Sequence, residues 1–80
     1  MIEQTIRDVL DKHGRLPGGL AAVGADDDLY AVGLTSHATV NIMLALEDAF
    51  DVEFPDDLLH KSTFASVSAI KSALLSIGAS

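Results

Sequence analysis

The run SHATVNIMLALEDAF, residues 36–50, most constrains the fold of this chain because it predicts one long amphipathic helix. Thr35 and Ser36 are both favourable N-cap residues, so the start of the helix is well marked. Apolar side chains recur along the run at helical spacing, and they predict a stripe that faces the core. We expect this stripe to contain Val40, Met43, Leu44 and Phe50, widened by Ile42, Leu46 and Ala49.

Three further helices are predicted around this run. Residues 2–13 carry apolar side chains at helical spacing, and Gly14 is suited to end that helix. A short helix is expected at about residues 56–61, where a proline and two acids are typical of a first helical turn. Ser66 is suited to cap a last helix that ends at Gly78.

Residues 14–35 contain five glycines and one proline, and no clean period survives in them. We therefore expect a long loop, which in a compact domain is usually functional or ordered by its own side chains. The side chains expected to anchor it to the core are Leu16, Leu20, Val23, Leu29, Val32 and Leu34, with Tyr30 as a further candidate.

The order of these elements predicts an all-α fold, a four-helix bundle with a long loop between its first two helices and a short third helix. The bundle is expected to form a single domain of residues 1–80. Composition agrees with an aliphatic helical core, because 49% of the residues are hydrophobic but only four are aromatic. The chain has no cysteine, so no disulfide compensates for the small core of a domain of this size.

No metal site is predicted. The three histidines are too scattered to suggest a zinc site by their spacing. The acidic run 26–28 does not continue as a calcium-binding loop, because Tyr30, Ala31 and His37 fall where that loop needs other residues. We interpret the run as a solvated acidic turn, with weak cation binding as the alternative.

The formal net charge of −7 disfavours binding to nucleic acid and to anionic membranes. The apolar runs are too short to span a bilayer, and the first residues do not form a signal peptide. We therefore expect a cytoplasmic protein, active as a monomer. A cluster of acids at residues 47, 48, 51, 53, 56 and 57 is either a solvated face around a turn or a docking surface for basic partners.

Ser36 is the candidate functional residue. Ser36 and His37 are adjacent, and neighbours on a helix do not face each other, so they do not make a nucleophile and its base. No other pattern in the chain indicates catalysis. Thr35 can cap the helix as well as Ser36, which would leave the Ser36 hydroxyl exposed where a helix start favours an attached phosphate.

Residues 33–55, GLTSHATVNIMLALEDAFDVEFP, resemble the acyl carrier protein family, and the order of predicted elements extends the resemblance to nearly the whole chain. The positions that fit the family pattern are Gly33, Ser36, Thr39, Val40, Leu46, Glu47, Phe50 and Pro55. The resemblance implies that a phosphopantetheinyl transferase attaches a 4′-phosphopantetheine arm from coenzyme A to Ser36. The thiol of this arm would hold an acyl or aminoacyl group as a thioester, so the chain would be a carrier and not an enzyme.

The chain departs from the commonest family motif, which has aspartate before the serine and leucine after it, because Thr35 and His37 stand there. Ala38 and Asn41 are neutral where acids are frequent in the family. We therefore hypothesise a discrete, specialised carrier of the amino acid, polyketide or peptide type, served by a dedicated ligase and a downstream transferase or synthase. The residues expected to contact these partners are Thr35, His37, Ala38, Val40, Asn41, Met43, Leu44, Glu47 and Asp48.

Two alternatives remain at this point: a carrier of fatty-acid synthesis, and an unmodified acidic helical adaptor in which Ser36 is only a cap. Met43, Leu44 and Leu46 could also line a cleft for an acyl chain, but at helical spacing they are more often core. Met1 and the close fit to one domain favour a discrete carrier over a piece of a larger synthase.

Overall fold

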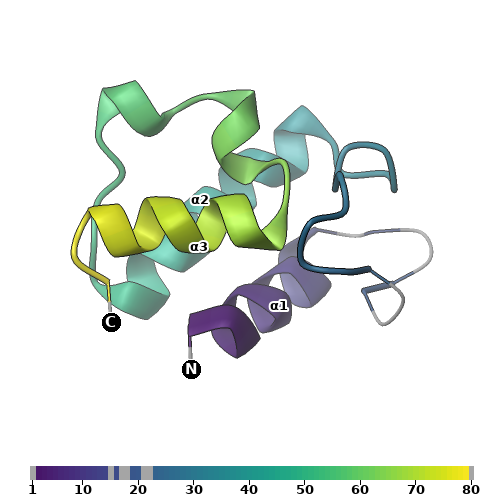
Figure 1. Cartoon of the computed structure of the whole chain (residues 1–80), viewed down its shortest axis with the longest axis horizontal. Coiled ribbons are helices and arrows are strands. Elements are labelled where there is room, and N and C mark those ends of the chain that lie inside the picture. Colours follow the sequence, from purple (N-terminus) through teal and green to yellow (C-terminus); the bar gives the residue numbers. More distant parts are fainter. Residues whose placement is uncertain (1, 15, 17–18, 21–22, 80) are drawn as a thin grey trace.

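A computed structural model describes residues 2–14, 16, 19–20 and 23–79. In these residues it contains three α-helices, two 3₁₀ helices and no strand (Figure 1). The predicted all-α class is therefore confirmed. The elements are α1 (Ile2–His13), α2 (Ser36–Phe50), η1 (Asp56–Leu58), η2 (Lys61–Phe64) and α3 (Val67–Ser76).

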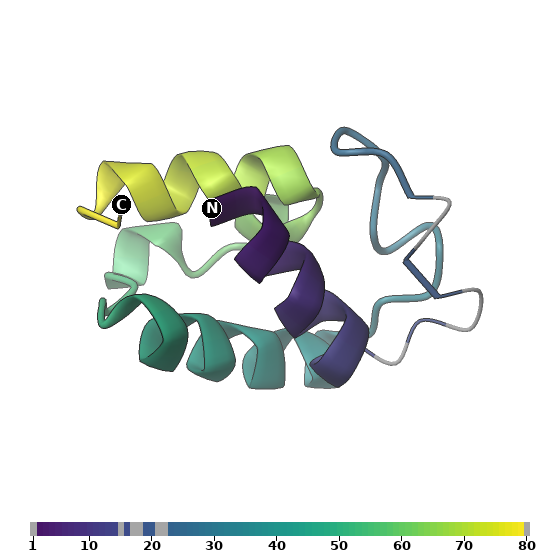
Figure 2. The same ribbon diagram turned by 90° about the horizontal axis from the view of Figure 1, so that it is seen from below.

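Helix α1 packs against both α2 and α3, and Figure 2 shows it crossing the other two helices. The segment of residues 51–66, which contains η1 and η2, lies on the side of the molecule away from α1 (Figure 1). The described part of the loop before α2 gathers at one end of the molecule. The arrangement is a three-helix core with a connecting segment that covers one face of it.

A short helix begins at Asp56, as predicted, but it ends at Leu58 and does not continue to about residue 61. The segment instead forms η1 and η2, separated by an extended stretch at Leu59 and His60. The physical reason is packing: η1 buries none of its residues, whereas Phe64 at the end of η2 is buried against Phe54, with ring centroids 5.3 Å apart. Two short turns bring Phe64 onto the core where one regular helix was expected.

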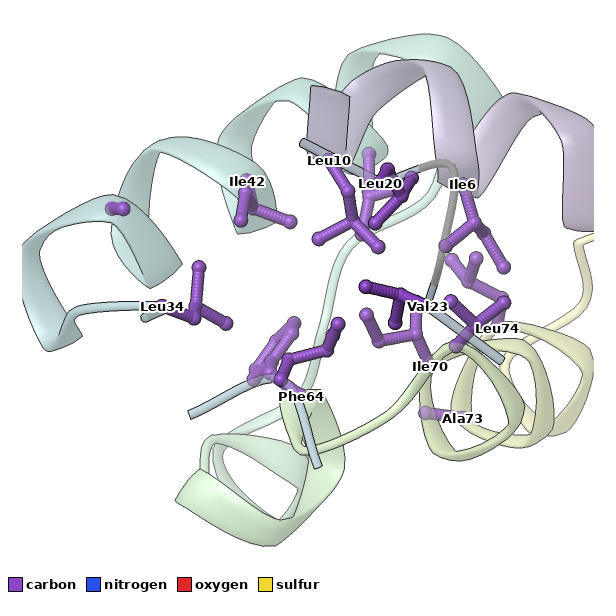
Figure 3. Close-up of a cluster of buried hydrophobic side chains, with 14 of the residues drawn as sticks. Ile6, Leu10, Leu20, Val23, Leu34, Ile42, Phe64, Ile70, Ala73 and Leu74 are labelled. Carbon is purple, nitrogen blue, oxygen red and sulfur yellow. The ribbon is translucent and has the colours of Figure 1, made fainter. Parts of the chain in front are cut away.

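Side chains from all three helices and from the loop form one aliphatic core. Ile6 and Leu10 of α1 are fully buried, as are Ile42 of α2 and Leu74 of α3. Figure 3 shows these side chains pointing toward one another, with Phe64 closing one side of the cluster. The predicted aliphatic core is confirmed for these residues.

The buried face of α2 differs from the predicted stripe. Ala38, Ile42 and Leu46 are buried at a spacing of four residues, whereas Val40 and Leu44 are 52% and 54% exposed. The run is apolar on most sides, so its periodicity alone does not predict which face of α2 is buried. The packing of α1 against α2 determines the buried face. The prediction that Val40 and Leu44 face the core is wrong.

Side-chain and backbone caps mark the helix ends. Ser66 accepts a hydrogen bond from the Ala69 N–H at 3.0 Å and begins α3, as predicted. At the other end of α3, Gly78 has φ 98° and donates to the Leu75 carbonyl, while Ala79 donates to the Leu74 carbonyl. This is the Schellman arrangement, which requires a residue with positive φ and explains the glycine predicted to end the helix.

The loop before α2 is held by its own apolar side chains, as the sequence predicts. Leu20, Val23, Leu29 and Leu34 are buried, whereas Val32 is 39% exposed, so its predicted anchoring role is wrong. Two backbone hydrogen bonds join the loop to the last part of the chain: the residue 29 N–H donates to the residue 65 carbonyl at 2.7 Å, and the residue 68 N–H donates to the residue 25 carbonyl at 2.9 Å.

No helix in the described part of the chain is long and apolar enough to cross a membrane. Five large apolar side chains are nevertheless exposed there: Val32, Val40, Leu44, Leu59 and Leu75. Val40 and Leu44 lie on α2, and Leu59 lies in the segment of residues 51–66 that contains η1 and η2.

Candidate functional site

Ser36 is the first residue of α2, and its side chain is exposed. The Thr35 hydroxyl accepts a hydrogen bond from the Ala38 N–H at 3.0 Å, so Thr35 supplies the cap of the helix. The Thr39 hydroxyl in turn donates to the Thr35 carbonyl at 2.9 Å and fixes the first turn. Because the cap comes from Thr35, the Ser36 hydroxyl is not needed for it, as the sequence predicts.

The backbone before Ser36 turns sharply to present the start of the helix. Gly33 has φ 116°, a conformation that L side chains rarely adopt. The next residue, Leu34, is buried and donates its N–H to the Leu29 carbonyl at 3.0 Å. Because Leu34 is anchored in the core, Ser36, two residues later, has a fixed position on the surface.

Ser36 borders an open groove of about 350 Å³ between the first half of α2 and the segment of residues 59–64. We call this the α2 groove. Its apolar walls are Val40 and Met43 on one side and Leu59 and Phe64 on the other. The remaining lining residues are Tyr30, Ser36, Thr39, His60 and Lys61.

Two polar contacts organise the rim of the α2 groove. The hydroxyls of Tyr30 and Thr39 are hydrogen-bonded, with oxygens 3.1 Å apart. The ammonium of Lys61 lies over the Tyr30 ring, 4.7 Å from its centroid, which is within the range of a cation–π interaction. Tyr30 therefore joins the loop, α2 and η2 at the edge of the groove.

The residues predicted to contact partners fall into three groups by burial: buried, half-buried and exposed. Ala38 is in the core, so its side chain presents no contact surface, and this part of the prediction is wrong. Met43 and Glu47 are half-buried. The other residues of the set are exposed: Thr35, His37, Val40, Asn41, Leu44 and Asp48.

Five of the exposed residues share one face of α2, because residues three and four apart on a helix are neighbours. We call them the α2 stripe, and they are His37, Val40, Asn41, Leu44 and Asp48. The stripe is neutral and partly apolar near Ser36, and its acid is at the far end. The structure thus brings together on one face a set that the sequence analysis proposed as a contact surface.

Glu47 has a structural contact inside this region. Its carboxylate accepts a hydrogen bond from the Phe54 N–H at 2.8 Å and so holds the turn after α2. The turn itself passes through Asp51, which has φ 53° and ψ 49°. These contacts support the view that part of the acidic cluster serves the turn, because one of its carboxylates is occupied by the chain itself.

The acidic run 26–28 is also engaged in local turns. The Asp27 carboxylate accepts from the Gly24 N–H at 2.8 Å, and the Asp28 carboxylate accepts from the Tyr30 N–H at 3.0 Å. In the described residues no group of three or more histidine, cysteine or acidic side chains is placed to hold a metal ion. Asp27 and Asp28 therefore stabilise local turns before Tyr30.

Sequence reasoning did not identify one wall of the α2 groove. Leu59, His60 and Lys61 come from the segment expected to be a single short helix, Phe64 follows that segment, and Tyr30 comes from the loop. One signal was present: Lys61 is the only lysine or arginine between Arg15 and Lys71. The pairing of this segment with α2 depends on tertiary packing and could not be read from spacing.

Comparison with known proteins identifies the family. Residues 2–73 match the model of the phosphopantetheine attachment site family. The chain is 51% identical over 67 residues to an aminoacyl carrier protein of Agrobacterium fabrum (strain C58 / ATCC 33970), covering 84% of this chain and 81% of that protein. Since the family model covers most of the chain, this protein belongs to the phosphopantetheine attachment site family of carrier proteins.

Solved structures support the same relationship. One similar chain is in the crystal structure of an engineered Bradyrhizobium japonicum glycine:[carrier protein] ligase complexed with a carrier protein from Agrobacterium tumefaciens and ATP. It has a TM-score of 0.93 and 45% identity, covering 96% of this chain and all of that one. A second is in the crystal structure of the B. japonicum ligase complexed with glycylated carrier protein, with a TM-score of 0.77 and 29% identity over 90% of this chain and 96% of that one.

Proposed function

We propose that this protein is an aminoacyl carrier whose 4′-phosphopantetheine arm is attached to the hydroxyl of Ser36. The observation that carries the proposal is the position of Ser36, exposed at the first residue of α2 and relieved of capping by Thr35. The start of a helix also favours the phosphate of the arm, because free backbone N–H groups and the helix dipole point toward it. Attachment at this residue agrees with the family to which the chain belongs.

The attachment itself requires a separate phosphopantetheinyl transferase. The Ser36 oxygen would form a bond to the phosphorus that carries the pantetheine of coenzyme A, and adenosine 3′,5′-bisphosphate would leave. Once attached, the arm supplies a terminal thiol that holds the cargo as a thioester. The chain has no cysteine, so no thiol of its own competes with the arm. In this proposal the chain positions the cargo and catalyses no step.

An amino acid is the favoured cargo, and glycine is the first candidate. Support comes from the relative named an aminoacyl carrier protein and from the similar chains in complexes with a glycine:[carrier protein] ligase. The neutral start of the α2 stripe also agrees with a specialised ligase better than with enzymes that recognise acids near the arm. A dedicated ligase would load the amino acid at the expense of ATP, and a downstream transferase would accept it.

Intact mass spectrometry tests the attachment. The protein is incubated with coenzyme A and a broad-specificity phosphopantetheinyl transferase, beside Ser36→Ala and the control Ser72→Ala, which removes another exposed helical serine. We expect one phosphopantetheine on the wild type and on Ser72→Ala, and none on Ser36→Ala. A modified Ser36→Ala protein, or an unmodified wild type beside a modified reference carrier, would contradict the proposal.

The cargo is tested on the arm-bearing protein with a glycine:[carrier protein] ligase, ATP and single amino acids. We expect a mass gain equal to one aminoacyl group, removed by neutral hydroxylamine because that reagent cleaves thioesters. Loading of fatty acids by an acyl-activating enzyme, without aminoacyl loading by the ligase, would favour the fatty-acid alternative.

A further inference from the structure

Tyr30 belongs to the loop before α2, but its backbone is anchored to the rest of the molecule. The preceding residue, Leu29, is fully buried, and its N–H donates to the Ala65 carbonyl at 2.7 Å. The N–H of Tyr30 itself donates to the Asp28 carboxylate at 3.0 Å. The Tyr30 side chain therefore starts from a point that is fixed against the core.

The hydroxyl of Tyr30 is the donor in its contact with Thr39. The Thr39 hydroxyl has a single proton, and it donates that proton to the Thr35 carbonyl at 2.9 Å. In the 3.1 Å contact between the two hydroxyls, Thr39 must then accept and Tyr30 must donate. The result is a directed chain of two hydrogen bonds from Tyr30 through Thr39 to the Thr35 carbonyl, which we call the Tyr30 brace.

The Tyr30 brace ends at the residue directly before Ser36. The first turn of a helix is weakly ordered in general, because its N–H groups lack partners within the helix and helix ends fray. Here the Thr35 carbonyl accepts two bonds from Thr39, one from its N–H at 3.0 Å and one from its hydroxyl at 2.9 Å. The brace adds a connection from outside the helix, so the loop holds the first turn of α2 as well.

We propose that Tyr30 is a positioning residue for the modification of Ser36. Through Thr39 it keeps the first turn of α2 ordered, so that the Ser36 hydroxyl meets the transferase in a fixed place. A segment that is already ordered loses less conformational entropy on binding, which lowers the KM of the enzyme that uses it. Because the Tyr30 hydroxyl is donated to Thr39, it acts through the helix and not by contact with the transferase. This inference rests on the attachment proposed at Ser36.

Steady-state kinetics of a phosphopantetheinyl transferase, with the carrier as the varied substrate and coenzyme A saturating, test the inference. Tyr30→Phe removes the hydroxyl and keeps the ring over which the Lys61 ammonium lies. We expect the KM for the carrier to rise about two- to tenfold, the factor that one net hydrogen bond contributes. The kcat should change little, because binding to the enzyme restores the order of the turn. Amide hydrogen exchange at Ala38 and Thr39 should become faster in this variant.

Substitutions of Thr39 provide the matched variants. Thr39→Ser keeps a hydroxyl that can accept from Tyr30 and donate to Thr35, so it should retain the KM of the wild type. Thr39→Val removes that hydroxyl and should raise the KM at least as much as Tyr30→Phe does. The double variant should be no worse than Thr39→Val alone, because both substitutions break one chain of hydrogen bonds. Additive effects would mean that Tyr30 contacts the transferase directly, and they would overturn the inference.

Ser66→Ala separates positioning from general stability. Ser66 caps α3, so this substitution also removes one side-chain hydrogen bond, but on another helix, and it should leave the KM unchanged. An equal rise of the KM in Ser66→Ala, or an unchanged KM in Tyr30→Phe, overturns the inference alone. A wild type that gains no arm by mass overturns the attachment at Ser36 as well, so the two failures are distinguishable.

Discussion

The two ends of α2 differ in charge and in how they are used. At its first turn the helix carries no acid, its cap is the neutral Thr35, and the Ser36 hydroxyl is exposed. At its last turn and just beyond, acids dominate, and Glu47 and Asp51 build the turn that follows. The comparison teaches that the acids of α2 are not spread evenly along this helix. The acids of α2 lie in its last turn, and none lies in its first turn, where the arm is proposed to attach.

The position of an acid along the helix explains why the two ends of α2 differ in charge. A carboxylate at the end of a helix accepts N–H groups of the following turn, as Glu47 does for Phe54. An acid beside Ser36 would repel the phosphate proposed to join it. If the two ends of α2 are also separate in function, a substitution at one end leaves the role of the other end unchanged.

The largest expected effect on stability is at the acidic end. Glu47→Ala leaves the Phe54 N–H without its acceptor, and a buried or half-buried donor without a partner costs about 1–3 kcal/mol. Asp48→Ala removes the same charge from an exposed neighbour and should change the free energy of unfolding by less than about 0.5 kcal/mol. Urea unfolding of both variants measures the difference.

Equal unfolding free energies for Glu47→Ala and Asp48→Ala would show that Glu47 does not hold the turn. Loading by the ligase provides the complementary measurement on the same two variants. If the acidic end serves only the turn, Asp48→Ala keeps its rate of loading. A strong loss of loading in Asp48→Ala would instead assign the acids to partner binding and remove the separation between the two ends.

The second expected effect concerns the α2 stripe beside Ser36. Leu44 is 54% exposed on α2, and Leu75 is 51% exposed on α3, so they form a matched pair. If the stripe contacts the ligase, Leu44→Gln should lower kcat/KM for aminoacyl loading about five- to thirtyfold, as for loss of a central interface contact. Leu75→Gln should leave it unchanged. Equal effects of the two substitutions would place the contact surface elsewhere.

The smallest expected effect is at the cap. Thr35→Val removes the hydroxyl that accepts the Ala38 N–H and should destabilise the protein by about 1 kcal/mol. Thr35→Asp keeps a capping oxygen and should retain the stability. Chemical unfolding of the two variants, followed by helical circular dichroism, makes the comparison. A Thr35→Val protein as stable as the wild type would mean that Ser36 replaces Thr35 as the cap.

Local signals predicted the helices correctly wherever a cap or a clear period was present. Thr35 and Ser66 mark the beginnings of α2 and α3, and Gly78 follows the end of α3, as expected. The segment after Pro55 has weaker signals, and there the predicted single helix is two 3₁₀ helices. Its conformation is decided by the burial of Phe64 beside Phe54, in a core to which all three helices and the loop contribute.

The candidate site divides in the same way, into residues that local sequence signals predict and residues that only tertiary packing places. Ser36 is identified by its own sequence context, because capping and the family pattern are both local. The opposite wall of the α2 groove, with Leu59 and Lys61, comes from a segment more than twenty residues away. No periodicity in one segment can report which other segment will face it.

The sequence by itself therefore determined the helical class, the helix starts and the residue proposed to carry the arm, since these depend on neighbours along the chain. Tertiary structure alone decided which face of α2 is buried. The helix is apolar on several sides, and packing of α1 against Ile42 leaves Val40 and Leu44 exposed. It also decided which residues line the α2 groove with Ser36, because only the folded chain brings Leu59 and Lys61 to the same depression as the start of α2.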